Sequence, residues 1–238
     1  MKTYIAIPVL SENNMVSEIL NRILVSTYTE IRPDEFKENI DKSIFIFDVT
    51  KNGLSKQLRN LIKSYANYGV FYKREKSANK YFKPEIRTNI AIGSALRHFN
   101  SFDSKGLHGY TNFLWIGQNC YFDNFDLKMF VDQSSLYHAI SPVIQSRNGL
   151  EVYKGIFDRF GIEYLILDDP IDFISGSIEE TYSLNPKCFA LSKQFANKLK
   201  NFYIADVDPV KYLNSLIYDN SDLAPRLLSD IFIHEHLY

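Results

Sequence analysis

The first half of the chain alternates apolar runs with amphipathic segments. Runs typical of strands buried on both faces of a sheet occupy residues 3–10, 43–48, 69–73 and 113–116. Between them, apolar side chains recur at helical spacing over residues 13–24, 54–65 and 86–99. Alternating strands and helices favour parallel pairing through right-handed crossovers. The sequence therefore predicts an α/β fold in which a mixed, mostly parallel sheet is flanked by helices.

The second half of the chain is less regular, and its elements rest on shorter signals. Helices are predicted at 125–130, 153–160, 189–199 and 210–218. Strands are predicted at 137–144, 163–167 and 230–234, with a short strand or loop at 173–177. No internal repeat, low-complexity tract or linker divides the sequence. A single domain over residues 1–238 is therefore expected.

The apolar run at 113–116 stops on Gly117, Gln118 and Asn119. In open α/β sheets, ligands bind at the carboxyl ends of the strands. If this run is a central strand, Gln118 and Asn119 lie at the edge of the sheet where a ligand binds.

The charge of the chain is balanced overall and uneven along its length. The 27 basic and 28 acidic side chains give a formal net charge of -1, which argues against a dedicated nucleic-acid or membrane-surface protein. Residues 51–105, however, carry 12 Lys or Arg against 3 Asp or Glu, whereas residues 106–238 carry 10 against 17. An anionic ligand is therefore expected near the middle of the chain.

The two cysteines, Cys120 and Cys188, provide neither a disulfide framework nor a zinc ligand set. Both are expected to be reduced core residues of a cytoplasmic protein. No apolar run approaches the length of a membrane span, and the N-terminal run is too short for a signal sequence.

Several segments, in their order and spacing, resemble GT-A-fold glycosyltransferases, and within them the large family often called family two. These segments are Ile-Ala-Ile-Pro-Val-Leu-Ser-Glu-Asn at 5–13, Phe-Ile-Phe-Asp at 45–48 followed by Asn-Gly at 52–53, Arg-Thr-Asn-Ile-Ala-Ile at 87–92, and Phe-Leu-Trp-Ile-Gly-Gln-Asn at 113–119. The resemblance implies a GT-A, Rossmann-like fold, with residues 1–122 as the nucleotide-binding half and 123–238 as the acceptor and catalytic half. It implies donor contacts by Pro8, Leu10, Glu12, Asp48, Arg87, Asn89, Gln118 and Asn119, with Asp48 contacting the nucleotide base.

The resemblance extends to two segments near the C-terminus. Tyr-Ile-Ala-Asp-Val-Asp at 203–208 looks like the acidic pair from which that family draws its catalytic base, so Asp206 or Asp208 is the candidate. Either residue could instead cap the following helix, since Pro209 suits its first turn. Glu179 and Glu180 are the alternative acids.

The second segment, Phe-Ile-His-Glu-His at 232–236, resembles the late His that completes the metal site of that family. His234 and His236 alternate along a predicted strand, so they would share one face, which is a reasonable half-site for a metal ion. The alternative is a polar tail.

The clearest departure from the family falls on residues 117–119. Where the family has an Asp-x-Asp carboxylate pair for Mn²⁺ or Mg²⁺, this chain has Gly117 and Asn119. An Asn can bind a cation through its amide oxygen, but it supplies no charge. Three interpretations stay open: a metal held by Asn119, His234 and the donor diphosphate, a metal-free enzyme, and a fold that has lost catalysis.

The resemblance implies a hexosyl- or pentosyltransferase that moves a sugar from a nucleoside diphosphate, by default uridine diphosphate, to an acceptor hydroxyl. The basic residues between Lys73 and Arg87 could stabilise the leaving diphosphate, or they could form a solvated loop. The acceptor could be a glycan or a modified DNA base, as in phage DNA modification, which the basic middle segment would suit.

Two other classes of function remain. One is a GT-A-fold binding or scaffold protein without catalysis. The other is a sugar-phosphate nucleotidyltransferase, although residues 8–14 lack the Gly-rich phosphate loop expected of that class.

Overall fold

A computed structural model describes residues 2–12, 18, 42–104, 109–122, 124–134, 136–146, 149–152, 165–167, 184–185, 187–198 and 226–235. The helices predicted at 153–160 and 210–218 and the segment predicted at 173–177 lie outside these residues. Of the helix predicted at 13–24, only Glu18 is described, and it is helical.

The predicted parallel half of the sheet is confirmed. It consists of β1 (Thr3–Val9), β2 (Lys42–Asp48), β3 (Val70–Arg74) and β4 (Asn112–Ile116), in the spatial order β3-β2-β1-β4. Each neighbouring pair is parallel. All seven residues of β1 and all five of β4 are buried, which explains why both appear in the sequence as continuous apolar runs.

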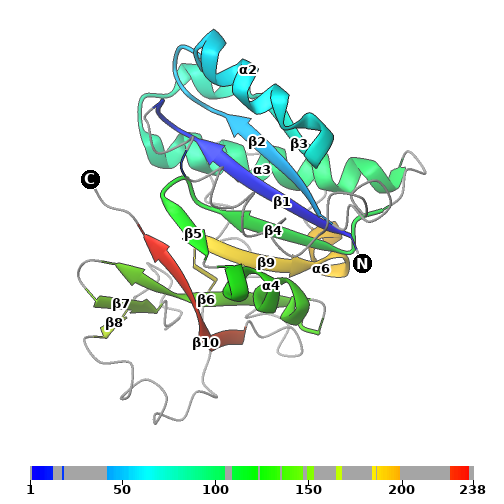
Figure 1. The fold of residues 1–238 in the computed structure, drawn as a ribbon, viewed down its shortest axis with the longest axis vertical. Helices are drawn as coiled ribbons and strands as arrows, with labels where there is room; N and C mark the ends of the chain where they lie inside the picture. The colour runs from blue at the N-terminus through cyan, green and yellow to red at the C-terminus, as the bar shows by residue number, and fades with distance from the viewer. Residues whose placement is uncertain are drawn as a thin grey trace.

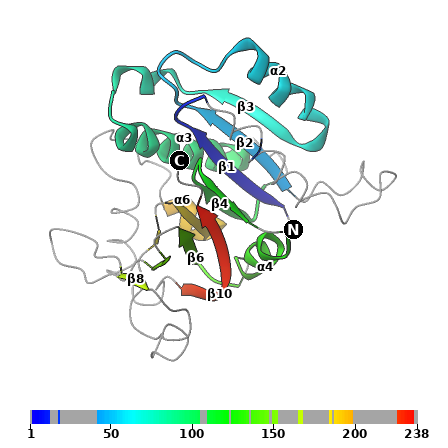
Figure 2. The ribbon, with the colours of Figure 1, turned by 60° about the vertical axis from the view of Figure 1, so that its left-hand side comes forward.

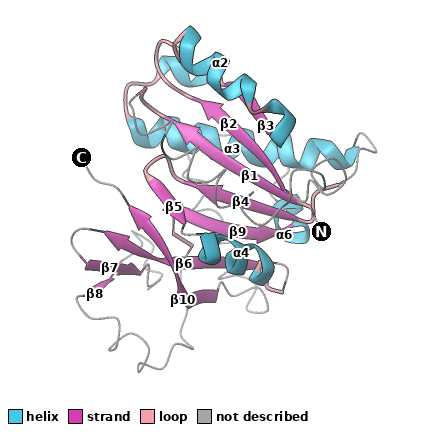
Figure 3. Cartoon of the chain, viewed as in Figure 1, coloured by secondary structure: helices cyan, strands magenta, loops and turns pink. Residues whose placement is uncertain are grey.

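The sheet continues beyond β4 with strands from the second half of the chain (Figure 1). These are β9 (Cys188–Ser192), β6 (Ala139–Ser146), β10 (Arg226–Glu235) and β5 (Cys120–Phe122), with β7 (Gly149–Val152) and β8 (Leu165–Leu167) branching from β6. Because β9 is antiparallel to both β4 and β6, and β10 is parallel to β6, strands β6 and β10 point in the same direction as β1. The sheet is thus mixed and mostly parallel, as predicted, and the carboxyl ends of β1, β4 and β10 face one edge (Figure 3).

Helices cover the two faces of the sheet (Figure 2). The helical elements are α2 (Lys56–Ser64), η1 (Ala66–Tyr68), η2 (Lys76–Lys80), α3 (Pro84–Ser104), α4 (Asn124–Gln133) and α6 (Lys193–Lys198). On one face, α2 buries Leu58 and Ile62 against the aliphatic side chains of β1 and β2. On the other face, α3 packs on an aromatic cluster centred on Tyr4, whose hydroxyl lies 2.8 Å from Nδ1 of His98.

The helix predicted at 189–199 is wrong in its first part. Residues 188–192 form β9, and only α6 is helical. Residues Cys188 to Leu191 are all buried, because β9 fills the gap between β4 and β6. A short apolar run of this kind looks the same in a buried strand and a buried helix.

Both cysteines are free and buried, as expected. Burial raises the pKa of the Cys188 thiol well above its ordinary value, and the nearby Cys120 adds to that rise. Among the described residues, no helix has the length and apolar character that crossing a membrane requires.

Candidate functional site

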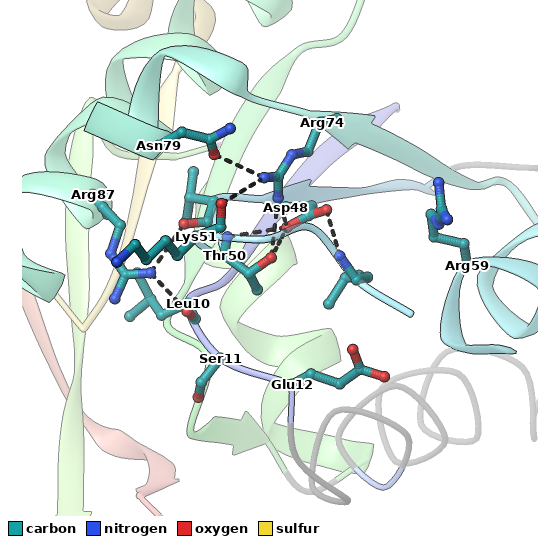
Figure 4. A network of polar contacts seen from close by, with 12 residues as sticks. Leu10, Ser11, Glu12, Asp48, Thr50, Lys51, Arg59, Arg74, Asn79 and Arg87 are labelled. Atoms are coloured by element: carbon teal, nitrogen blue, oxygen red, sulfur yellow. Dashed lines mark hydrogen bonds and ion pairs between the residues drawn. The ribbon is translucent and has the colours of Figure 1, made fainter. Parts of the chain in front are cut away.

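Three loops meet where β1, β2 and β4 end, and their side chains form the candidate site. They are residues 10–12 after β1, residues 49–54 after β2 and residues 117–119 after β4. This edge of the sheet, the rim, is also where Arg87 of α3 reaches the loops. Figure 4 shows the polar contacts of the first two loops.

The carboxylate of Asp48, at the end of β2, accepts five hydrogen bonds. Its Oδ1 accepts hydrogen bonds from the main-chain nitrogen of Thr50 (3.0 Å), the Thr50 hydroxyl (2.7 Å) and Nη1 of Arg74 (2.5 Å). Its Oδ2 accepts from the main-chain nitrogen of Leu54 (3.0 Å) and the Tyr72 hydroxyl (2.6 Å). Asp48 is fully buried, so its carboxylate is enclosed by protein donors.

Burial and hydrogen bonding act in opposite directions on the pKa of Asp48. Burial alone would raise it, but the hydrogen bonds from Tyr72, Thr50 and Leu54 outweigh burial and hold the pKa below its ordinary value. The carboxylate is therefore charged over the whole neutral range and forms an ion pair with Arg74.

The Arg74 side chain packs against the loop after β2 and binds it through hydrogen bonds. Nη2 of Arg74 donates to Oδ1 of Asn79 (2.7 Å) and to the main-chain oxygen of Lys51 (3.4 Å). Gly53 has φ +83, and a Cβ on it would lie 3.5 Å from the guanidinium carbon of Arg74. A glycine therefore suits this position, because the backbone is left-handed and passes over the flat guanidinium group.

The ion pair between Asp48 and Arg74 was not predicted from the sequence. A signal was present, since β2 ends on Asp48, β3 ends on Arg74, and in the parallel register the two residues are paired. Two adjacent predicted strands that end on opposite charges could have been paired in this way.

Gln118 connects the turn after β4 to the loop after β1. Its Oε1 accepts from the main-chain nitrogens of Leu10 (2.5 Å) and Ser11 (3.3 Å), and its Nε2 donates to the main-chain oxygen and the hydroxyl of Ser11, both at 3.3 Å. The residue is only 8% exposed. The structure thus brings together the predicted donor contacts Gln118 and Leu10, and it joins them to each other.

Gly117 is the residue at which the sequence resemblance expects the first carboxylate of the family, and the neighbouring backbone leaves little room for a side chain there. The main-chain nitrogen of Gly117 donates to the main-chain oxygen of Lys187 at 2.7 Å. A Cβ at position 117 would lie 3.0 Å from that same oxygen and 3.6 Å from Sγ of Cys120. The close approach of the segment before β9 therefore disfavours any side chain at this position.

Asn119 has a buried Oδ1 atom with no hydrogen-bond partner among the described residues. An unpaired amide oxygen of this kind can coordinate a hard cation, or it can accept a hydrogen bond from an N–H or O–H group of a ligand. It brings no negative charge, and no three His, Cys, Asp or Glu side chains gather around a possible metal position in the described part of the chain.

Arg87 joins the ends of β1 and β2 from the side of α3. Its Nη1 donates to the main-chain oxygens of Leu10 (3.0 Å) and Val49 (3.2 Å). Its Nε is buried and has no partner among the described residues. Arg87 therefore braces two of the three loops and adds a positive charge to the rim.

The remaining predicted donor contacts have different surroundings. Glu12 accepts a hydrogen bond from the main-chain nitrogen of Ser55 (2.7 Å), and the Ser55 hydroxyl caps α2. Pro8 is buried inside β1, in register with Phe47 of β2, and Asn89 is half-buried on α3. Of these three, Glu12 is the one on a loop of the rim.

Strand β10 brings the C-terminal segment to the turn after β4. In its antiparallel pairing with β5, His234 is in register with Tyr121 and Glu235 with Cys120. The backbone at His234 and Glu235 therefore lies close to Asn119 in space. The other predicted site residues, His236, Asp206, Asp208, Glu179 and Glu180, lie outside the described residues.

The solved structures that share this fold include three GT-A glycosyltransferases. The chain is similar to residues 1–349 of TarS from S. aureus, with a TM-score of 0.55, 14% identity and coverage of 99% of this chain and 60% of that one. It is similar to the mannosyltransferase PcManGT from Pyrobaculum calidifontis, in complex with GDP-Man and Mn²⁺, with a TM-score of 0.57, 13% identity and coverage of 98% and 56%. It is also similar to GalNAc-T7 with UDP, GalNAc and Mn²⁺, with a TM-score of 0.60, 11% identity and coverage of 98% and 43%.

These likenesses establish the GT-A fold that the sequence motifs predicted. The chain spans between 43% and 60% of the length of these three structures. No protein-family model matches the sequence, and no curated protein matches it.

Proposed function

We propose that the protein is a glycosyltransferase that moves a sugar from a nucleoside-diphosphate sugar to an acceptor hydroxyl. The observation that carries this proposal is the rim itself, where Arg87, Leu10 and Gln118 connect the loops at the carboxyl ends of β1, β2 and β4. This is where open α/β sheets bind their ligands, and Arg87 supplies positive charge for a diphosphate. A UDP-sugar is the favoured donor, because structures of TarS and GalNAc-T7 contain UDP.

Within this proposal, residues 123–238 form the acceptor and catalytic half. Asp208 or Asp206 takes the proton of the acceptor hydroxyl if the anomeric configuration inverts, and Glu179 or Glu180 is the alternative base. Cationic side chains of the rim stabilise the departing diphosphate electrostatically.

A divalent cation fits this site only in part. PcManGT and GalNAc-T7 were crystallised with Mn²⁺. The residues that would hold the ion in this chain are Asn119, His234 and His236, with the donor diphosphate supplying the negative charge. Since these ligands are neutral, a bound cation would neutralise the diphosphate, and its affinity would depend strongly on the donor.

The acceptor is a glycan or a modified base in DNA. The observation that favours DNA is the exposed face of α2, where Lys56, Arg59 and Lys63 follow one another at helical spacing and the helix has no acidic residue. The helix begins at the rim, because Glu12 binds the nitrogen of its cap Ser55. A DNA duplex whose phosphates bind along α2 would therefore lie next to the proposed donor site.

The experiment measures donor binding and transfer separately. Thermal unfolding is followed with UDP, GDP and UDP-sugars, with and without Mn²⁺, and slow hydrolysis of the UDP-sugar reports sugar transfer to water. A functional donor site raises the Tm with nucleotide. Asp208→Asn or Asp206→Asn is expected to abolish hydrolysis while leaving the nucleotide-induced shift, and Asp132→Asn, an exposed change on α4, serves as the matched control.

The outcomes separate the candidate functions. No shift with any nucleotide would contradict the proposal. A shift without hydrolysis or transfer would favour the catalytically degenerate binding protein, which the neutral Gly117 and Asn119 also support. Release of pyrophosphate from a nucleoside triphosphate and a sugar phosphate would identify the nucleotidyltransferase.

A further inference from the structure

The carboxylate of Asp48 has no hydrogen-bonding capacity left for a ligand. A carboxylate offers about four lone-pair positions. The two oxygens of Asp48 already accept five hydrogen bonds, from Thr50, Leu54, Tyr72 and Arg74. The expected contact from Asp48 to a nucleotide base would require one of these bonds to break in a fully buried position, which costs about 1–3 kcal/mol. Base recognition is therefore expected from another group of the rim.

Three aromatic side chains of β3, β4 and the segment before α3 have partners within the protein. Tyr72 donates to Asp48, Trp115 is fully buried in β4, and Tyr81 packs against the aromatic core. The exposed ring beside the rim is Phe82, which is 76% exposed and precedes the first turn of α3, the helix that carries Arg87. No feature of the sequence distinguished Phe82 from the other aromatic residues.

Phe82 is linked to the rim through Lys51. The ammonium Nζ of Lys51 lies 4.2 Å from the centroid of the Phe82 ring, and the main-chain oxygen of Lys51 accepts from Arg74. In Figure 4 the Lys51 side chain extends toward Arg87, which binds the main-chain oxygen of Val49 two residues before Lys51. The exposed ring of Phe82 and the cation of Arg87, which lie outside the rim loops, thus both contact the loop after β2, which carries the second cation, Lys51.

A single exposed Phe is common on protein surfaces and by itself indicates nothing. Phe71 provides the comparison, since it is 44% exposed but stacks on Phe45 of the core, with ring centroids 5.1 Å apart. The described partner of the Phe82 ring is instead a lysine ammonium, which an anionic ligand can attract away from it.

We propose that Phe82 is the stacking platform for the base of the donor nucleotide, and that Lys51 leaves the ring to bind the diphosphate. This inference rests on the proposed function and adds how the donor is recognised. Every base has a π face, so stacking binds bases with little discrimination. With Asp48 saturated, the donor site is expected to bind UDP and nucleoside diphosphates of other bases with similar affinities, so a preference for UDP-sugars would not arise from the base.

Titration calorimetry of the full chain tests this inference, with UDP, CDP, ADP and GDP as ligands and ribose 5-diphosphate as the probe without a base. The wild-type protein is expected to bind the four nucleotides within about tenfold of one another and ribose 5-diphosphate more weakly. Phe82→Ala is expected to weaken each nucleotide by about 10- to 100-fold, the loss of one base stack, and to leave ribose 5-diphosphate unchanged. Phe82→Trp should restore nucleotide binding, and Phe71→Ala is the control without effect.

Two results would overturn the inference alone. In the first, Phe82→Ala does not change the affinity for nucleotides, or it lowers that affinity by no more than it lowers the affinity for ribose 5-diphosphate. The second is a preference of the wild-type protein of more than 100-fold for one base, which would mean that hydrogen bonds, and not stacking on Phe82, recognise the base. Absence of nucleotide binding by the wild-type protein would overturn the proposed function as well.

Discussion

Oε1 of Gln118 accepts a hydrogen bond from the main-chain nitrogen of Leu10 at 2.5 Å, although the two residues are 108 positions apart in sequence. The same amide group also binds Ser11 through both its oxygen and its nitrogen. Since Arg87 binds the main-chain oxygen of Leu10, this residue is held from both sides. The loop after β1 is therefore positioned by a side chain of the turn after β4 and a side chain of α3. A substitution of Gln118 should thus change the proposed donor site.

Gln118→Ala is expected to lower the free energy of unfolding by about 1–3 kcal/mol, because the main-chain nitrogens of Leu10 and Ser11 lose their acceptor. Urea denaturation measures the change. Gln57→Ala, at an exposed position of α2, is the matched control and should stay within about 0.5 kcal/mol of the wild type. Equal stability of the two variants would show that the loop does not depend on Gln118.

Asp48→Asn is expected to destabilise the protein at pH 7 by about 3–5 kcal/mol, since it leaves Arg74 without its buried carboxylate partner. The pKa of Asp48 is lowered in the folded state, so its contribution is present above the unfolded value near 3.8 and is lost as the pH falls through the lower folded value. The wild type should therefore lose stability between about pH 5 and pH 2 more steeply than the variant.

Glu75 also contributes to the loss of stability in acid, so the pH dependence of the wild type has to be compared with that of Asp48→Asn. Burial would raise the pKa of Glu75, but hydrogen bonds from Ser77 and Ser94 and the charge of Lys73 lower it, so Glu75 adds to the acid sensitivity of both proteins. Unfolding free energies are measured across this pH range for the wild type and Asp48→Asn. Parallel pH profiles would contradict the role of Asp48.

Gly117→Ala is expected to destabilise the protein by about 1–3 kcal/mol, because the new Cβ would lie 3.0 Å from the main-chain oxygen of Lys187. Gly117→Asp, which restores the first carboxylate of the resembling family, should destabilise it further. Chemical denaturation measures both variants. A Gly117→Asp variant as stable as the wild type would mean that the segment before β9 moves aside at little cost.

Replacing Lys56, Arg59 and Lys63 together by Gln is expected to weaken binding to duplex DNA and to reduce the slope of log affinity against log salt by about 2–3, if each residue contacts one phosphate. Fluorescence anisotropy at several salt concentrations measures both quantities. Lys198→Gln on α6 is a control for an exposed charge away from α2. Salt dependence that is unchanged in the triple variant, or no duplex binding at low salt, would leave a glycan as the acceptor.

The parallel half of the fold could be predicted because its strands are buried on both faces and its helices separate them. Strand β9 could not be predicted. Its four buried residues from Cys188 to Leu191 fit a helix as well as a strand until the neighbouring strands β4 and β6 are known. Parallel pairing also explains why Asp48, Leu10 and Gln118 lie at one edge of the sheet, where Gln118 was expected. Their hydrogen bonds could not be predicted, since the partners are main-chain groups of loops whose paths the sequence does not determine.

The position of β10 has a consequence for the order in which the protein can assemble. β5 follows β4 directly in the chain, yet β5 pairs with β10, which is synthesised far later. In the sheet, β10 lies between β5 and β6. During synthesis, the strands that carry Asp48 and Arg74 can pair while β5 still lacks this partner. The surroundings of Asn119 should therefore form late in folding, after the long-range closure that slows such topologies.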